Sequence, residues 1–237
     1  MNYQGNVVLI TGGTGALGTA VTGAFLRAGA MAVVTYIIDA EVEPFYAAVK
    51  DRRPHVTLYK ADVTKERDVR RVVQNTINKH GQIDVLVNIA GGFVGGIPVA
   101  ETPEEKWDFM LNLNTKSAFL CSKAVLPHML TRRAGRIVNI SARAGLHGSA
   151  GLGAYAVAKS GVLILTQAIA DEVKDQGITV NAVLPSIIDT PANRKAMSDA
   201  DHTRWVRPED IARVILFLAS DDARAITGAG IPVYGRA

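Results

Sequence analysis

Short runs of apolar and β-branched residues recur along this chain with helix-forming stretches between them, and this alternation constrains the fold more than any other feature. The runs are almost continuously apolar, which is typical of strands that helices cover on both faces. They predict a doubly wound α/β Rossmann fold with a seven-stranded parallel sheet. The expected strands are residues 6–11, 31–36, 56–60, 83–88, 135–141, 178–184 and 230–234.

The size of the chain and its charge bound its organisation and its partners. With 237 residues and 48% hydrophobic positions it can bury one large core, so residues 1–237 are expected to form a single domain. The formal net charge of +4 comes from scattered basic residues, which predicts a solvated surface and no nucleic-acid partner. The chain shows no signal-peptide pattern at its start and no apolar run of about 18 residues, so no membrane partner is expected.

Cysteine and histidine usage gives two further expectations. Cys121 is the only cysteine, which excludes an internal disulfide and favours a reducing, cytoplasmic setting. His80, His128 and His202 lie in polar surroundings without the spacing of metal ligands, so no metal site is expected.

A glycine-rich turn joins the first expected strand to a helix. Gly12 permits a tight turn, Gly15 lets the backbone approach a pyrophosphate, and Gly18 lets the helix pack against the sheet. The amino end of that helix offers free N–H groups and a positive dipole to an anion. A glycine triplet in this context predicts a dinucleotide-binding site.

Two segments that follow later strands fit the same site. Asp62 and Val63 end the third strand, where a carboxylate can accept from an adenine amino group while the valine lies against the ring. The alternative for Asp62 is a cap for the helical stretch that begins near Lys65. Asn88 and the small residues up to Gly92 follow the fourth strand and leave room for a ribose.

Tyr155 and Lys159 are four residues apart on an expected helix, so they lie on one face of it. A free tyrosine has a pKa of about 10, which makes it a poor acid and base at neutral pH. We expect the ammonium of Lys159, together with an oxidised nicotinamide, to lower the pKa of Tyr155. The alternative is that Tyr155 packs in a core while Lys159 reaches to solvent.

These motifs, in this order, resemble the short-chain dehydrogenase/reductase family over essentially the whole chain. The resemblance implies a catalytic Tyr155 and Lys159, with Asn114 holding a water that links Lys159 to solvent. It also implies a homodimer or homotetramer built on helical stretches 103–132 and 154–176. The implied cofactor-binding residues are Gly12, Gly15, Leu17, Gly18, Tyr36, Asp62, Val63, Asn88, Ala90, Gly91, Tyr155, Lys159, Pro185, Ile188 and Thr190.

The chain departs from the family at one catalytic position. The family has a serine 13 positions before the tyrosine, and here that position is Ala142. The neighbouring Ser141 is expected to point to the opposite face of the strand. Losing one donor to a developing oxyanion costs about 3 kcal/mol in barrier. Either Arg143 or His147 compensates, or the substrate develops no localised alkoxide.

Several segments are similar to dihydropteridine reductases, which also have alanine at that position followed by a basic residue. Those enzymes reduce a conjugated, imine-like ring in which the incoming charge is spread over nitrogen atoms. Tyr36 stands where they carry an acid, and other segments fit bacterial-type family members equally well. The similar segments are residues 15–18, 90–96, 146–148 and 184–195.

The cofactor is expected to be NAD or NADP. A carboxylate at the end of the second strand would favour NAD and an arginine there would favour NADP, but Tyr36 and Ile37 supply neither. No lysine or arginine lies between Gly12 and Gly18, which favours NAD, with Asp39 as a substitute acid.

The polar connection at residues 186–206 is expected to form a mobile substrate lid, because such connections at the ligand end of a sheet are usually functional. Phe93 and Trp205 are candidate walls of a flat pocket.

The predicted function is hydride transfer between a nicotinamide cofactor and a small carbonyl, alcohol or pterin-like imine substrate, with Tyr155 as proton donor and acceptor. The alternative is a nucleotide-sensing protein without turnover, which the missing serine permits. The intact Tyr155, Lys159 and Asn114 argue against that alternative.

Overall fold

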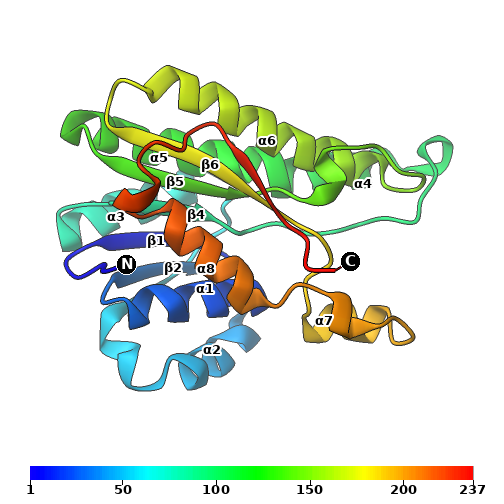
Figure 1. The fold of residues 1–237 in the computed structure, drawn as a ribbon, viewed down its shortest axis with the longest axis horizontal. Helices are drawn as coiled ribbons and strands as arrows, with labels where there is room; N and C mark the ends of the chain where they lie inside the picture. Colours follow the sequence, from blue (N-terminus) through cyan, green and yellow to red (C-terminus); the bar gives the residue numbers. More distant parts are fainter. Residues whose placement is uncertain (237) are drawn as a thin grey trace.

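A computed structural model describes residues 1–236, and it contains one sheet of seven parallel strands. The order across the sheet is β3-β2-β1-β4-β5-β6-β7, and Figure 1 shows the strands between two layers of helices. The predicted single-domain, doubly wound fold is confirmed. The strands are β1 Val7–Thr11, β2 Met31–Tyr36, β3 Val56–Lys60, β4 Val85–Asn88, β5 Gly135–Ile140, β6 Ile178–Pro185 and β7 Gly230–Val233.

The chain reverses its direction across the sheet at β1, which pairs with β2 on one side and with β4 on the other. In the β1–β4 pair, Thr11 is opposite Asn88, so both strands end at the same level. Loops that leave neighbouring strands in opposite directions open a crevice at such a point. This is where the glycine turn lies.

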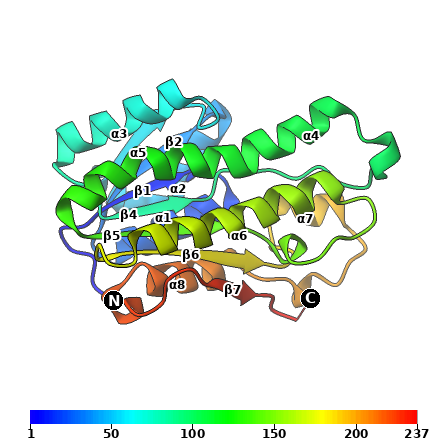
Figure 2. The ribbon, with the colours of Figure 1, turned by 90° about the horizontal axis from the view of Figure 1, so that it is seen from above.

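Helices cover both faces of the sheet, and Figures 1 and 2 show α1, α2 and α8 on one face and α3, α5 and α6 on the other. Each face buries its own apolar core, with Phe25 in the first and Met129 in the second. Cys121 is buried in the second core. The α-helices are α1 Ala16–Arg27, α2 Val42–Val49, α3 Glu66–His80, α4 Glu104–Met110, α5 Ser117–Arg132, α6 Gly153–Val173, α7 Pro191–Ala196 and α8 Pro208–Leu218.

The expected helical stretch 103–132 contains a local widening. A π-helical segment, η4 Leu111–Lys116, lies between α4 and α5, and it holds Asn114. Such segments accommodate an additional residue in a helix and occur frequently at functional sites. Short 3₁₀ turns complete the chain at η1 Asp39–Glu41, η2 Lys50–His55, η3 Val99–Glu101, η5 Arg143–Gly145, η6 His202–Arg204 and η7 Asp221–Ala223.

Helix α6 is long and apolar enough, by length and composition, to cross a membrane. Here it packs along β6, and its buried residues include Val162 and Ile169. Its other face leaves Val157 and Ile164 exposed. The helix therefore has one apolar face on the sheet and one that residues 1–236 leave exposed.

The connection after β6 carries α7 and η6 and is tied back to the body of the protein. Ile188 forms a parallel bridge with Val206, and the Asp189 N–H donates to the Val206 carbonyl over 2.8 Å. Trp205 is buried and its ring lies 4.4 Å from that of His202. Trp205 is thus a buried residue of the connection, and its ring packs against His202.

Candidate active site

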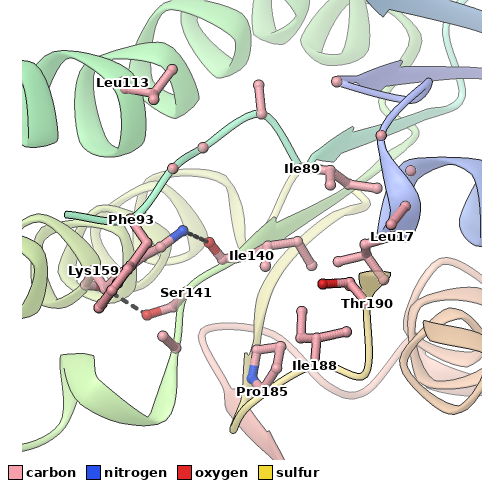
Figure 3. A pocket seen from close by; sticks show the side chains of 18 of the residues that line it. Leu17, Ile89, Phe93, Leu113, Ile140, Ser141, Lys159, Pro185, Ile188 and Thr190 are labelled. Atoms are coloured by element: carbon pink, nitrogen blue, oxygen red, sulfur yellow. Dashed lines mark hydrogen bonds between the residues drawn. The ribbon is translucent and has the colours of Figure 1, made fainter. Parts of the chain in front are cut away.

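A cavity of about 1020 Å³ opens at the carboxyl ends of the strands, and its wall includes most of the predicted site residues. Figure 3 shows Lys159 and Ser141 toward one end and Leu17 with Thr190 toward the other. The predicted residues in the wall are Gly12, Gly15, Leu17, Gly18, Tyr36, Asp62, Val63, Ala90, Gly91, Tyr155, Lys159, Pro185, Ile188 and Thr190. The predicted residues outside it are Asn88 and Asn114.

The glycine turn forms the amino end of α1. Gly12 has a φ of +62°, and a Cβ there would lie 3.0 Å from the Ala90 Cα. A Cβ at Gly18 would lie only 2.2 Å from the Gly12 carbonyl oxygen. Both positions therefore require glycine.

Gly15 differs from the other two glycines. It has an ordinary φ of −66°, and a Cβ there would meet only the Gly12 carbonyl oxygen at 3.6 Å. No side chain caps α1, and its first turn carries no acidic residue. The first N–H groups of a helix lack intrahelical partners, so this end of the cavity is suited to an anionic group.

The end of the cavity beyond the turn holds two carboxylates. Asp62 accepts hydrogen bonds from the N–H and the hydroxyl of Thr64, at 2.9 and 2.7 Å, so it does not cap α3, but it also lines the cavity. Glu41 lines the cavity as well, and it accepts a 2.6 Å hydrogen bond from the hydroxyl of Thr14 in the glycine turn. Sequence reasoning did not identify Glu41.

Asp39, the acid that the sequence suggested as a substitute, points elsewhere. Its carboxylate pairs with Lys60 at 2.5 Å, both side chains are more than half exposed, and neither lines the cavity. Asp39 is therefore not the acid of this site.

Asn88 lies below the cavity in a buried polar network. Its side-chain amide donates to the side-chain Oδ1 of Asn139 at 2.8 Å and to the Ser122 hydroxyl at 3.3 Å. Asn139 in turn donates to Thr166 at 2.9 Å. The network links β4 and β5 to α5 and α6, and a role for Asn88 in shaping a ribose site stays a prediction.

Lys159, the lysine of the predicted catalytic pair, is buried. The Lys159 ammonium donates a 2.9 Å hydrogen bond to the Ile140 carbonyl, as Figure 3 shows, and its nitrogen lies 6.0 Å from the centre of the Tyr155 ring. Burial lowers the pKa of Lys159 to about 8, because the ammonium loses its hydration. The alternative of a lysine reaching to solvent is wrong.

The pKa of Tyr155 moves in the direction opposite to the one expected. Burial raises it to about 12, because a phenolate is less well solvated here than in water. Lys159 does not reverse this effect in the protein alone. The lowering that the sequence argument expected therefore rests on the second charge it named, that of an oxidised nicotinamide.

Asn114 and Lys159 approach each other around Gly91. A Cβ at Gly91 would lie 2.7 Å from the Asn114 Oδ1 and 3.3 Å from the Lys159 Nζ. The Asn114 side chain accepts from the Gly92 N–H and donates to the Gly92 and Met110 carbonyls. The π-helical segment thus holds this amide close to Lys159, and the water relay stays a prediction.

The strand β5 ends without a hydroxyl at the family's serine position. Ala142 lines the cavity in an extended conformation. Ser141 touches the cavity but is only 2% exposed, and its hydroxyl donates to the Lys159 carbonyl at 2.7 Å. The carbonyl of the preceding residue, Ile140, accepts the hydrogen bond from the Lys159 ammonium.

The end of the cavity near Tyr155 combines apolar and basic side chains. Phe93 lines it, and its ring meets that of Tyr155 edge to face with centroids 4.9 Å apart. Arg143 and His147 also line it, and the Arg143 guanidinium lies 5.2 Å from the centre of the Tyr234 ring. Phe93 thus lies where the sequence expected a wall, whereas Trp205 does not line the cavity.

Two residues of the connection after β6 reach the cavity next to Thr190. Thr190 caps α7 by accepting from the Asn193 N–H at 3.2 Å, and Asn193 and Met197 both line the wall. Across residues 1–236, no group of three or more His, Cys, Asp and Glu side chains is arranged to hold a metal ion.

Comparison with known proteins gives matches along the whole chain. A family model described as enoyl-(acyl carrier protein) reductase matches residues 13–235. The chain is 35% identical to a 3-oxoacyl-[acyl-carrier-protein] reductase of Thermotoga maritima, with 99% of this chain and 98% of that protein covered. It is 31% identical to dehydrogenase/reductase SDR family member 6 of Rattus norvegicus, with 98% and 97% covered.

Solved structures also match along nearly the whole chain. ElxO with NADP bound is 31% identical, with a TM-score of 0.92 and 97% of each chain covered. NAD⁺-bound xylitol dehydrogenase is 27% identical, with a TM-score of 0.92 and 99% and 100% covered. This chain belongs to the short-chain dehydrogenase/reductase family.

Proposed function

We propose that this protein is an NAD(P)-dependent oxidoreductase in which Tyr155 exchanges a proton with a carbonyl or alcohol substrate. The observation that carries the proposal is the position of Tyr155 and Lys159 in the wall of the same cavity as the glycine turn. Names of similar proteins, including the Thermotoga maritima 3-oxoacyl-[acyl-carrier-protein] reductase, support a reductase of carbonyl groups.

The residues around the cavity fit a dinucleotide. Gly12 and Gly18 keep the turn tight, and the uncapped end of α1 would hold the pyrophosphate. Val63 and Asp62 would bind the adenine, while Ile188 and Thr190 would contact the nicotinamide end. The bound dinucleotide would supply or accept the hydride. The similar structures include both NADP and NAD⁺ complexes, so they favour neither cofactor.

The proton chemistry follows from the burial of the pair. With a pKa of about 12, Tyr155 is protonated at neutral pH and can donate to an oxygen that gains negative charge. Lys159 lies beneath the Tyr155 ring, where its positive charge would stabilise the phenolate left behind. Asn114 would hold the water that returns the proton to Lys159.

A pterin-like imine is a second candidate substrate, and Ala142 is the observation that favours it. A localised alkoxide would lack the usual hydroxyl donor, because Ser141 gives its hydroxyl to the Lys159 carbonyl. A conjugated imine spreads the incoming charge over its nitrogen atoms and depends less on such a donor. Phe93 supplies an aromatic ring for stacking on a flat substrate.

The experiment that tests the proposal follows oxidation of NADH and NADPH with a panel of ketones, quinones and quinonoid dihydropterin. Turnover of ketones supports the main proposal. Turnover of the dihydropterin alone supports the second candidate. Tight dinucleotide binding with no turnover of any substrate would contradict both and favour a nucleotide-sensing protein.

We also infer a homodimer or homotetramer. Trp107, Phe109 and Phe119 on α4 and α5, and Val157 and Ile164 on α6, are each between 38% and 59% exposed. Helix faces of this kind are covered by a partner in most soluble proteins. The connection at 186–206 is proposed as the substrate lid, because Thr190, Asn193 and Met197 reach the cavity from it.

A further inference from the structure

The wall of the cavity beyond the glycine turn carries negative charge without a balancing cation. Of the charged residues that line this cavity in residues 1–236, Glu41 and Asp62 lie beside the turn and β3, whereas Arg143 and Lys159 lie at the end near Tyr155. The wall residues contributed by β2, the turn after it and the end of β3 are Thr35, Tyr36, Ile37, Ile38 and Ala61, none of them basic. An additional phosphate at this end would meet two carboxylates and no cationic side chain of the wall.

Glu41 lies in the turn after β2. In dinucleotide-binding folds, the acid that binds the adenosine ribose usually comes from the end of that strand. Strand β2 ends at Tyr36, and the chain then forms the 3₁₀ turn η1 Asp39–Glu41. This turn brings the Glu41 carboxylate to the Thr14 hydroxyl at 2.6 Å, one residue before the amino cap of α1. The partly buried carboxylate therefore lies beside the place where the glycine turn would hold a pyrophosphate.

Thr14 leaves the carboxylate able to accept further hydrogen bonds. The Thr14 hydroxyl binds one oxygen of Glu41, Oε2. An ionised carboxylate has two oxygens and about four acceptor positions. The hydroxyls of an adenosine ribose are donors, whereas a 2′-phosphate is a dianion that offers acceptors only.

We propose that Glu41 selects NAD(H) over NADP(H) by accepting from the ribose hydroxyls and repelling a 2′-phosphate. This inference rests on the proposed dinucleotide binding and extends it to the choice of cofactor. At an effective dielectric constant of about 20, like charges a few ångströms apart discriminate by tenfold or more. The residue that makes the choice comes from η1 and not from the end of β2.

The test measures dissociation constants of NADH and NADPH by isothermal titration calorimetry, without turnover. Wild-type protein is expected to bind NADH at least about tenfold more tightly than NADPH. Glu41→Gln keeps an oxygen for the Thr14 hydroxyl and removes the charge, so it is expected to reduce that ratio by about tenfold. Asp39→Asn is the matched control, because it removes an equal charge from the same turn at a residue paired with Lys60 outside the cavity.

A second variant distinguishes an effect of the Glu41 charge from an effect of its hydrogen bond to the glycine turn. Thr14→Val removes the hydroxyl that binds Glu41 and keeps the carboxylate. If Glu41 acts by its charge, Thr14→Val retains the preference for NADH, and added salt narrows the preference in wild type because it screens the repulsion. If Glu41 only anchors the glycine turn, Thr14→Val changes the ratio as Glu41→Gln does, and the inference is overturned.

The remaining outcomes test the role of Glu41 and the proposed dinucleotide binding separately. NADPH bound as tightly as NADH by wild type, or a ratio unchanged in Glu41→Gln, overturns the role of Glu41 and leaves the proposed oxidoreductase standing. Binding of neither dinucleotide overturns the proposed function together with the inference.

Discussion

The hydroxyl of Ser141 donates a 2.7 Å hydrogen bond to the carbonyl oxygen of Lys159. This bond joins the end of β5 to α6 and engages the serine hydroxyl as a donor. The neighbouring Ala142 lines the cavity and offers no donor. The predicted catalytic pair, Tyr155 and Lys159, is therefore present without the hydroxyl that the family resemblance implies at position 142.

Restoring that hydroxyl is expected to increase ketone reduction. Ala142→Ser places a donor at the family position, and one oxyanion donor is worth about 10²- to 10³-fold in kcat. We expect kcat/KM for ketones to rise by at least about tenfold, measured by NADH or NADPH oxidation. The matched control is Ser141→Ala, which should lose about 1 kcal/mol of stability and little activity, because its hydroxyl binds a helix carbonyl. An unchanged rate in Ala142→Ser would show that another group already fills the role.

Removing the phenolic hydroxyl of Tyr155 is expected to lower kcat by about 10²- to 10⁴-fold, the usual contribution of a general acid. Dinucleotide affinity should change by only a few-fold, because the ring and its contact with Phe93 remain. Rates and calorimetric dissociation constants of Tyr155→Phe are compared with those of Tyr59→Phe, which removes a phenol outside the cavity wall. Activity that survives in Tyr155→Phe would mean that another group donates the proton.

The buried Lys159 is expected to make stability depend on pH. Its pKa is about 8 in the folded protein and 10.5 in its ordinary state, so the unfolded chain binds more protons between these values. Stability should therefore rise with pH through this window, by up to about 3 kcal/mol, and fall as pH decreases toward 8. Urea unfolding of wild type and Lys159→Met at pH 7, 8.5 and 9.5 measures this difference.

The difference in free energy of unfolding, wild type minus Lys159→Met, should become more favourable to wild type as pH rises. Tyr155 does not obscure the result, because its raised pKa of about 12 affects stability only above the ordinary value of 10.0. A difference that stays constant from pH 7 to 9.5 would mean that Lys159 keeps an ordinary pKa.

Two glycines of the turn, Gly18 and Gly15, should respond differently to substitution by alanine. Gly18→Ala places a methyl group 2.2 Å from the Gly12 carbonyl oxygen, so the backbone must move, and we expect a stability loss of several kcal/mol. Gly15→Ala meets only one atom at 3.6 Å and should keep the wild-type melting temperature. Thermal unfolding followed by circular dichroism compares the two. Equal melting temperatures would contradict the close packing at Gly18.

Most of the fold could be predicted because the strands are short, largely apolar runs that alternate with helix-forming stretches. The fourth run shows the limit of that pattern. Ile83 is apolar and buried, but its N–H binds His128, and Asp84 binds the Val7 N–H through its carboxylate. The Asp84 N–H also donates to the Val7 carbonyl, and its carbonyl accepts from the Arg136 N–H, so pairing with the neighbouring strands starts one residue before β4, which begins at Val85.

The site could be predicted where spacing alone brings side chains together, as with Tyr155 and Lys159. Glu41 could not, because its position depends on how η1 folds back toward Thr14. Asp39 and Glu41 are two residues apart in a turn with three residues per revolution, so they point in different directions. The direction of the Tyr155 pKa depends on burial, which no local pattern encodes.

The reversal of strand order at β1 and β4 separates the loops around the cavity into two groups. The loops after β1, β2 and β3 carry the glycine turn, Glu41 and Asp62, whereas those after β5 and β6 carry Ala142 and Thr190. With the proposed roles, a substitution at Glu41 that alters cofactor choice would lie in the first group of loops, and a substitution at Ala142 that alters the substrate would lie in the second. The two properties can be redesigned, or can evolve, one at a time.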